Sequence, residues 1–388
     1  MKIKKNFLRD ILIYADIVLF LICSGSCIGI VYAKYFDIIY VGVAFTILLM
    51  MSRKVNRKNT SILFFFLFLY VVSYVINRKY SPNINAYLSY ALRMFGTFCV
   101  LSSFTRNEFE SKYVNTMEVL NVLGLFSFIL VLSTGLKHSL NYVGIFPLFG
   151  PFNFIKLHER RNSGIFWEPG AYQLFLLYEL LILFKNSSWK LPKKRDRAKA
   201  IVCIISLLSS KSTTGYLLLG GFFTFFLVIN WSSLTVKKRI MSLFPLVALF
   251  VGGLLLLFNS SVVQDKLTTN NISYSIRLND LLSSINILIR QHPLFGFGYE
   301  SSMVSYLNES SAIYNNSVGI FAQMLSVGVV FVLSFIFFIL KNAQKVYHQE
   351  KWVLWLILVV MCFTEDFFMY PVFFMWLFLP NMVEKSGL

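Results

Sequence analysis

The chain has 388 residues, of which 57% are apolar and only 14% are charged, about half the charged fraction of an ordinary soluble domain. This composition excludes a soluble enzyme, and it also excludes a disordered or fibrous chain. The net charge of +18 would indicate nucleic-acid binding in a soluble protein. Here the basic residues stand in short clusters between long apolar runs, which indicates a membrane protein without a nucleic-acid partner.

Apolar segments follow one another along the sequence and predict about 10 to 12 transmembrane helices, with twelve as the main interpretation. The chain is therefore predicted to be an all-α polytopic membrane protein with a single transmembrane domain, residues 1–388. Three segments are short for a helix that must cross with about 20 residues, and these are predicted to be tilted, re-entrant or longer than they look. They are the seventh, eleventh and twelfth of the segments 11–31, 36–51, 61–76, 84–104, 117–135, 171–184, 200–210, 214–230, 241–258, 316–340, 352–363 and 367–380.

The basic clusters predict which ends of these helices face the cytoplasm. With the N-terminus inside, every second connection carries lysine and arginine, as the positive-inside bias requires. Both termini are then cytoplasmic, and two long connections face outside, at 136–170 and 259–315. Loops of this length are more often functional than connective. The basic clusters lie at 2–9, 53–58, 190–199, 237–239 and 341–351.

The second outer loop contains a helical pattern at 275–291, SIRLNDLLSSINILIRQ. Its leucines and isoleucines recur at helical spacing on one face, opposite Arg277, Asp280 and Gln291. This pattern predicts an amphipathic helix that lies in the outer membrane interface.

The first outer loop ends in HERRNSGIFWEPGAYQLFLLYELL, residues 158–181. Glu168 stands at the N-cap position and Pro169 at the first helical position, where proline is favoured. Tyr172 and Glu179 follow at helical offsets, so both glutamates are predicted on one face of the sixth helix. Glu168 is interpreted either as a cap or as a catalytic carboxylate, and Glu179 as half of a buried pair.

Three arginines are candidates for phosphate binding, because a guanidinium offers a rigid fork of donors to phosphate oxygens. Arg160 and Arg161 lie outside, against the charge bias, and lipid headgroups or Glu159 are the simpler partners. Arg93 falls within the fourth predicted helix and needs a carboxylate or a phosphate there. A structural pair between Arg93 and Glu179 would satisfy it without a ligand.

Two further segments carry polar groups on the predicted outer side. SSKSTTGY, at 209–216, places Lys211 among hydroxyls and is either a phosphate contact or a plain turn. RQHPLFGFGYE, at 290–300, groups Arg290, His292 and Glu300 around two glycines that permit a close approach of the backbone. Arg290 is a further candidate for diphosphate binding. A single histidine is more often structural than catalytic, but this one has ionisable neighbours in a loop.

Several chemistries lack their sequence signatures. No D-x-D, HExxH, GxxxxGK[ST] or GxSxG motif occurs, so neither a metal-dependent sugar-nucleotide transferase nor an ATPase is supported. No cofactor and no metal site are predicted. The five cysteines fall inside apolar runs without metal-ligand or disulfide spacing, and they are predicted to be buried core residues: Cys23, Cys27, Cys99, Cys203 and Cys362.

Four segments stand in an order that resembles the O-antigen polymerase and ligase superfamily. They are RRNSGIFWEPGAYQ, SKSTTGY, SIRLNDLLSSINILIRQHPLFGFGYE and YNNSVGIFAQMLSVGVV. The GIFWEPG form is similar to Wzy-type polymerases of capsular, exopolysaccharide or O-antigen repeat units. The resemblance covers residues 156–330 in its motifs and the remainder in topology alone.

The resemblance implies a metal-independent glycosyl transfer at the outer face of the bacterial cytoplasmic membrane. The substrate would be an undecaprenyl-diphosphate-linked oligosaccharide in the membrane lipid, and a chain-length regulator and a flippase are implied partners. The family's outer-loop arginines match Arg161, with Arg160 beside it, and Arg277. Its glycine-containing segment matches 292–298. Fixed arginines suit this reaction because charge develops on the leaving diphosphate.

One departure from the family pattern bears on the base. The ligase branch has a histidine about eleven residues before the glycine matched by Gly328, where this chain has Asn316, Ser317 and Val318. This weakens the lipid A ligase interpretation. Glu168 is the first choice for the general base, followed by Glu300 and His292, since burial raises the pKa of a carboxyl group toward neutrality.

Two alternatives remain open from the sequence. A lipid-oligosaccharide flippase or transporter would also need many helices and intramembrane charges, although the two related halves common in transporters are not visible. A teichoic-acid or protein-glycan ligase of the same superfamily would differ in its acceptor and share the donor.

Overall fold

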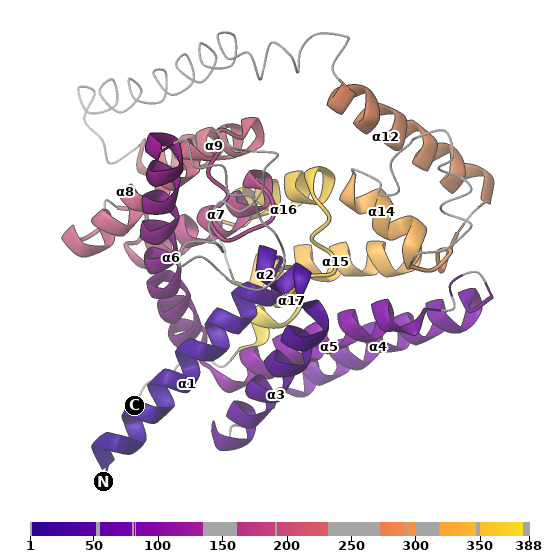
Figure 1. The fold of residues 1–388 in the computed structure, drawn as a ribbon, viewed down its shortest axis with the longest axis horizontal. Coiled ribbons are helices and arrows are strands. Elements are labelled where there is room, and N and C mark those ends of the chain that lie inside the picture. The colour runs from indigo at the N-terminus through magenta and orange to yellow at the C-terminus, as the bar shows by residue number, and fades with distance from the viewer. Residues whose placement is uncertain are drawn as a thin grey trace. The chain divides into compact units, whose positions relative to one another are not determined.

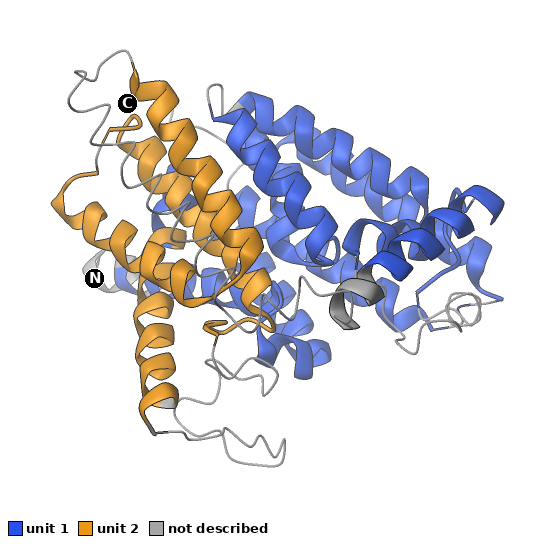
Figure 2. Cartoon of the chain, turned by 90° about the horizontal axis from the view of Figure 1, so that it is seen from above, with its two compact units in different colours: residues 1–112, 275–388 blue, residues 113–274 orange. Residues whose placement is uncertain are grey.

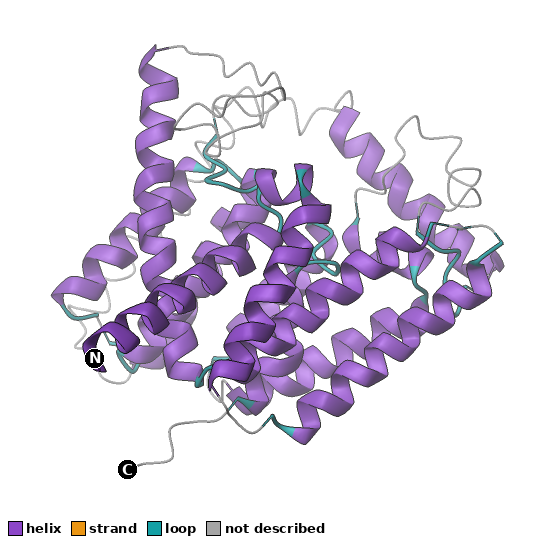
Figure 3. Cartoon of the chain, turned by 60° about the horizontal axis from the view of Figure 1, so that its bottom comes forward, coloured by secondary structure: helices purple, strands orange, loops and turns teal. Residues whose placement is uncertain are grey.

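The computed structural model describes residues 2–51, 55–79, 81, 83–134, 161–190, 192–231, 272–291, 293–299, 318–346 and 350–382. Across these residues the secondary structure is helical and contains no strand, which confirms the predicted all-α class (Figure 3). The α-helices, labelled in Figure 1, are α1 (Lys2–Cys23), α2 (Cys27–Val31), α3 (Ala33–Met51), α4 (Arg57–Asn77), α5 (Ile84–Ser103), α6 (Arg106–Thr134), α7 (Pro169–Asn186), α8 (Lys194–Ser209), α9 (Thr213–Asn230), α12 (Ile272–Gln291), α14 (Gly319–Ser326), α15 (Val329–Val346), α16 (Lys351–Thr364) and α17 (Pro371–Phe378). The 3₁₀ turn η3 (Leu379–Asn381) follows α17.

Four of these helices are long and apolar enough to cross a membrane: Ala33–Met51, Arg57–Asn77, Arg106–Leu130 and Thr213–Asn230. On Arg57–Asn77 the side chains of Phe64, Phe68, Val71 and Val75 are each 59–65% exposed. Their spacing of four, three and four residues places them on one face. An exposed apolar stripe of this kind is compatible with contact to lipid.

The chain divides into two compact units (Figure 2). Unit 1 contains residues 1–112 and 275–388, and unit 2 contains residues 113–274, so the two boundaries fall within α6 and α12. The predicted single transmembrane domain and its twelve-helix bundle stay predictions. The ninth predicted segment, 241–258, and most of both long connections predicted to face outside lie outside the described residues.

In unit 1, the short apolar segment near the C-terminus forms a buried helix. All eight residues of α17 are buried, and the helix contacts α1, α4, α5 and α15. Proline at its first position favours this start, because the missing N–H would have no helical acceptor there. Its eight residues are too few to cross a bilayer alone, and their apolar side chains are packed in the core of unit 1.

In unit 2, the central element is α7. Every residue from Ala171 to Phe184 is buried, and the helix contacts α8 and α9. The Tyr113 hydroxyl of α6 donates a hydrogen bond to the Phe175 carbonyl at 3.1 Å. The polar side chains of a helix that is buried on all sides need hydrogen-bond partners within the protein. The partners of Glu179 and Gln173 are therefore described below.

Two predicted helices are interrupted. The first, 11–31, ends at Cys23 and resumes at Cys27, where Ser26 caps α2 by accepting a hydrogen bond from the Gly29 N–H at 2.9 Å. The tenth was predicted to be continuous over 316–340, and this prediction is wrong. The segment breaks into α14 and α15 at Val327 and Gly328. Gly328 has φ +104°, which a side chain would strain. Hydropathy alone does not show such a break.

Candidate functional site

The segment 161–168, called here the α7 entrance, is held against the turn between α8 and α9. Arg161 Nε donates a hydrogen bond to the Ser210 carbonyl at 3.1 Å. The Asn162 backbone N–H donates to the Ser209 carbonyl at 3.1 Å, and the Asn162 side-chain amide donates to Ser209 Oγ at 2.8 Å. The structure thus brings together two of the segments on which the family resemblance is based.

The shape of the α7 entrance follows from its small residues. Asn162 Oδ1 accepts a hydrogen bond from the Gly164 N–H at 2.9 Å, as in an Asx turn. Gly164 has φ +58°, and a Cβ atom there would lie 2.9 Å from the Tyr172 ring. Phe166 is buried and stacks on Phe175, with ring centroids 3.8 Å apart. These contacts fix the backbone from which Arg161 extends.

The turn between α8 and α9 presents Lys211. Its backbone has φ +49° and its side chain is exposed. The turn is anchored to α7 because Gln173 Nε2 donates to Ser210 Oγ at 3.2 Å. Gly215 allows this approach, since a Cβ atom there would lie only 2.3 Å from the Gln173 amide carbon. The two predicted phosphate-binding cations of unit 2, Arg161 and Lys211, are therefore supported by the same turn.

Glu168 occupies the predicted N-cap position of α7, and Pro169 follows at the first helical position. The Glu168 backbone is extended, and its carbonyl accepts the Tyr172 N–H at 3.1 Å. Its side chain makes no capping hydrogen bond. The interpretation of the Glu168 side chain as a helix cap is therefore wrong, and the half-buried carboxylate needs another explanation.

Tyr172 and Glu179 share a face of α7, as predicted, and both contact Asn121 of α6. The Tyr172 hydroxyl donates to Asn121 Oδ1 at 2.6 Å, and Asn121 Nδ2 donates to Glu179 Oε2 at 2.7 Å. Glu179 is fully buried. This amide–carboxylate contact replaces the predicted ion pair between Glu179 and Arg93.

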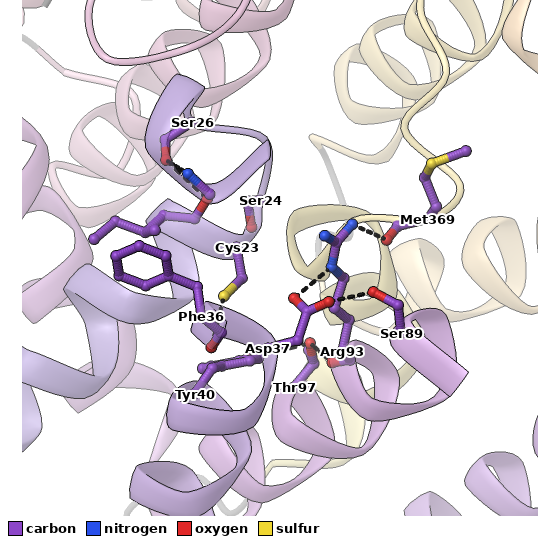
Figure 4. A network of polar contacts seen from close by, with 12 residues as sticks. Cys23, Ser24, Ser26, Phe36, Asp37, Tyr40, Ser89, Arg93, Thr97 and Met369 are labelled. Carbon is purple, nitrogen blue, oxygen red and sulfur yellow. Dashed lines mark hydrogen bonds and ion pairs between the residues drawn. The ribbon is translucent and has the colours of Figure 1, made fainter. Parts of the chain in front are cut away.

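Arg93 lies in unit 1 and pairs with Asp37 instead (Figure 4). Arg93 Nε donates to Asp37 Oδ1 at 2.7 Å, and the second carboxylate oxygen accepts a hydrogen bond from Ser89. The guanidinium also faces the rings of Tyr90 and Tyr370, at 5.9 and 5.4 Å from their centroids. A carboxylate partner for Arg93 is confirmed, and its identity is corrected. The predicted role of Arg93 in binding diphosphate stays a prediction.

The remaining predicted site residues belong to the two long connections that are predicted to face outside. The predicted amphipathic helix is α12 (Ile272–Gln291). Arg277 lies on it with its side chain outside the described residues, and Arg290 is exposed in its last turn. Arg160, His292 and Glu300 also lie outside the described residues.

The glycine-containing segment 293–299 is seated on the break between α14 and α15. The Phe297 N–H donates to the Leu325 carbonyl at 2.7 Å, and the Gly298 N–H donates to the Ser326 carbonyl at 2.9 Å. The Val329 N–H returns a hydrogen bond to the Pro293 carbonyl at 3.2 Å. The predicted close approach at the two glycines is confirmed, because a Cβ atom at Gly296 would lie 2.3 Å from the Ser326 carbonyl oxygen.

A polar group in unit 1 was not predicted. Gln323 on α14 donates to both carboxylate oxygens of Asp366 through Nε2, at 3.1 and 2.9 Å. The Tyr299 hydroxyl donates to Gln323 Oε1 at 2.9 Å. Two features of the sequence could have indicated this group. Asp366 is an acidic residue in the short connection between the last two predicted helices, and Gln323 is a glutamine within an apolar segment.

Among the described residues, no cluster of three or more His, Cys, Asp or Glu side chains could hold a metal ion. All five cysteines are free and buried, as predicted. Comparison with protein-family models and with curated protein sequences gave no match for this chain. The family resemblance therefore rests on the motifs and on their arrangement.

Proposed function

We propose that this chain is a membrane glycosyltransferase that polymerises undecaprenyl-diphosphate-linked oligosaccharide repeat units. The observation that carries the proposal is the contact between the α7 entrance and the turn at 209–212, where Arg161 and Lys211 come from one support. These two segments are far apart in sequence and belong to the motif order that resembles the polymerases. One cation on this turn and a second one hydrogen-bonded to it suit a diphosphate.

The geometry of Arg161 supports a role in the transfer step. Its Nε donates to a backbone carbonyl, which fixes the plane of the guanidinium relative to the turn. Attack of a sugar hydroxyl on the anomeric carbon expels the lipid diphosphate, so negative charge grows on its phosphate oxygens. Donors that are already oriented stabilise this charge without reorganising. The reaction proposed here needs no metal, because arginine and lysine supply the positive charge.

The contacts within each unit agree with a topology in which both termini are cytoplasmic. In unit 2, Lys199 contacts Glu118 at 3.0 Å, and both lie beside the starts of the apolar segments 117–135 and 200–210, which are predicted to begin on the inner side. In unit 1, Asn56 donates to the Asn381 carbonyl at 2.9 Å, again between inner ends. Because helix ends on one side of a membrane meet each other, these contacts favour an outer location for the α7 entrance. The membrane is proposed to be the bacterial cytoplasmic membrane.

The test is a polymerisation assay with purified full-length protein in proteoliposomes. The donor is lipid-linked oligosaccharide extracted from host cells that lack this chain, and the product is a ladder of oligomers. Arg161→Lys should lower the ladder formed per inserted molecule by about 10- to 100-fold, since an ammonium keeps the charge but loses the fork of donors. Arg57→Lys makes the same change at an exposed position on α4 and is the matched control.

Near-normal polymer from Arg161→Lys would contradict the proposed role of Arg161, and the absence of any ladder from the wild-type protein would contradict the function. A ligase of the same superfamily would consume the donor and attach single or preformed chains to another acceptor without a ladder. A chain-length regulator would narrow the ladder without being needed for its formation.

A flippase is the second candidate, and the break between α14 and α15 favours it. Discontinuous helices often form the substrate sites of transporters. A flippase would move the labelled lipid-linked oligosaccharide across the vesicle membrane and leave its length unchanged. Accessibility of the sugar to an external glycosidase, measured with and without ladder formation, distinguishes transport from transfer.

A further inference from the structure

Gln173 of α7 is a buried polar residue behind the turn that carries Lys211. Its Nε2 donates a hydrogen bond to Ser210 Oγ at 3.2 Å. Ser210 Oγ in turn donates to the Leu207 carbonyl at 2.6 Å, and the Ser210 carbonyl accepts from Arg161 Nε at 3.1 Å. Gln173 therefore holds the residue that binds Arg161 and that directly precedes Lys211.

The amide of Gln173 lowers the stability of its own surroundings. Gln173 is fully buried, and its Oε1 accepts no hydrogen bond from any residue in the described part of the chain. A buried acceptor without a donor is unfavourable, and an apolar side chain of similar length would fill the same space without this penalty. Packing alone therefore gives no reason for an amide at this position, whereas the donor group Nε2 does.

Two neighbours of this amide also have unusual geometry. Lys211 has φ +49°, in the left-handed region that disfavours residues with a side chain. Gly215 of α9 packs so closely on Gln173 that a Cβ atom there would lie 2.3 Å from the amide carbon. A strained backbone persists only where its surroundings enforce it, and such strain clusters at functional sites.

Both cations that depend on this support have accessible surface. The Lys211 side chain is exposed and Arg161 is partly exposed. A lysine side chain is flexible, so the region that its ammonium can reach depends on where the backbone is held. A diphosphate has two phosphate groups joined by one oxygen, and it binds two cations held in place more tightly than two cations that must first be ordered.

We propose that Gln173 is the positioning residue of a diphosphate-binding site that Arg161 and Lys211 form on unit 2. This inference rests on the proposed function, and all of its residues belong to one unit. Through Ser210, Gln173 fixes the carbonyl that orients the Arg161 guanidinium and the backbone from which Lys211 extends. Gln173 does not touch the ligand. It reduces the freedom that the two cations lose when the diphosphate binds.

The experiment measures the binding of inorganic pyrophosphate to the purified full-length protein in detergent micelles by isothermal titration calorimetry. Pyrophosphate reproduces the two phosphates of the donor without its sugar or its lipid. Gln173→Met removes Nε2 and keeps the length of the side chain, so the Kd should rise by about 3- to 10-fold. The free energy of unfolding should not fall, because the buried Oε1 is removed as well and Ser210 keeps its bond to Leu207.

This separation of binding from stability distinguishes a positioning role from a structural one. Wild-type affinity in Gln173→Met would overturn the inference. A lower free energy of unfolding alongside the weaker binding would overturn it too, because Gln173 would then support the fold as a whole. Gln323→Met makes the same change at a buried glutamine of unit 1, and it should bind pyrophosphate as wild type does.

Two glycine substitutions on α9 test the same contact without removing a polar group. The methyl group of Gly215→Ala would displace the Gln173 amide, so the Kd for pyrophosphate should rise in this variant as well. Gly220→Ala is the matched control, because no group of the described residues lies within 4 Å of the Cβ atom added there. Equal affinities of the two glycine variants overturn the inference, and this comparison decides if Gln173→Met does not insert.

Ladder formation separates this inference from the proposed function. If Gln173→Met forms the ladder with an unchanged KM for the lipid-linked donor, the positioning role is overturned and the polymerase stands. If pyrophosphate binding depends on Gln173 but the wild-type protein forms no ladder, the polymerase is contradicted and the diphosphate site stands. A wild-type protein that does not bind pyrophosphate overturns the site itself.

Discussion

Each unit buries a carboxylate within its helices, but the donors that hold the two carboxylates differ in charge. In unit 1, Asp37 accepts from the Arg93 guanidinium at 2.7 Å. In unit 2, Glu179 accepts from the Asn121 amide at the same distance, 2.7 Å. Since burial and distance match, the contrast isolates the effect of the donor. An ion pair needs both of its charges, whereas an amide contact tolerates a neutral acceptor.

The two arrangements predict different sensitivities to substitution. Removing one member of a buried ion pair strands a charge and costs about 3–5 kcal/mol. Removing an amide that serves two polar groups leaves both unsatisfied, at about 1–3 kcal/mol for each group. Replacing an acid by its amide is harmless only where the donor is neutral. Substitutions at these positions should therefore cost more stability in unit 1 than in unit 2.

The largest effect is expected for Arg93→Ala. The Asp37 carboxylate would lose its cation while its side chain is only 2% exposed, so the free energy of unfolding should fall by about 4 kcal/mol. Unfolding of the purified full-length protein in mixed detergent micelles measures this loss. Yield of inserted protein in the membrane gives an independent readout in the same direction.

Double variants identify the partner of Arg93. Arg93→Ala/Asp37→Ala should recover part of the lost stability, because it removes the stranded charge. Arg93→Ala/Glu179→Ala should be at least as unstable as Arg93→Ala alone, since Glu179 contacts Asn121. Recovery in the second double variant and none in the first would support the pairing expected from the sequence and would contradict the pairing in the structure.

The sequence was sufficient to show that Arg93 needs an anion, but it did not identify which one. Hydropathy places some helices to within a few residues, as α5 (Ile84–Ser103) against the predicted 84–104 illustrates, whereas α6 (Arg106–Thr134) begins 11 residues before the predicted 117–135. It contains no information on how helices face one another. Asp37 begins an apolar segment, where an acid is ordinary, and nothing singled it out. Glu179 was the evident candidate because it is an acid in the middle of an apolar helix. Charge complementarity alone therefore suggested the wrong pair, Arg93 with Glu179.

The candidate site also contains residues that the sequence indicated and residues that it did not. The sequence named Arg161 and the turn at 209–216 separately as candidate phosphate contacts, and the hydrogen bond between Arg161 and Ser210 was found only in the structure. The group of Tyr299, Gln323 and Asp366 was missed. Gln323 and Asp366 are 43 residues apart, and Gln323 lies on the short helix α14, just before the helix break at Gly328. A break caused by backbone packing leaves no mark in a hydropathy pattern.

An intermediate effect is expected for Asn121→Ala in unit 2. The Tyr172 hydroxyl loses its acceptor and Glu179 loses its donor, so the free energy of unfolding should fall by about 2–3 kcal/mol. Asn107→Ala on the same helix is the control, because Asn107 is exposed and its loss should change stability by less than about 0.5 kcal/mol. Equal effects of the two substitutions would show that the Asn121 contacts contribute nothing.

The smallest effect is expected for Glu179→Gln, and it tests the comparison most directly when measured beside Asp37→Asn. Both substitutions convert an acid to its amide with little change in volume. At Glu179 the new amide oxygen still accepts from Asn121, and no cation loses its partner in this contact, so stability should change by less than about 1 kcal/mol.

At Asp37 the same chemistry leaves the Arg93 guanidinium buried beside a neutral group, and the loss should be about 3 kcal/mol or more. Comparing the stability losses of Asp37→Asn and Glu179→Gln therefore tests whether a charged donor makes the carboxylate harder to replace than a neutral donor does. If Glu179→Gln proved as costly as Asp37→Asn, Glu179 would have to be held as an anion by a cation. Lys199, which contacts Glu118 in the same unit, would then be the residue to substitute next.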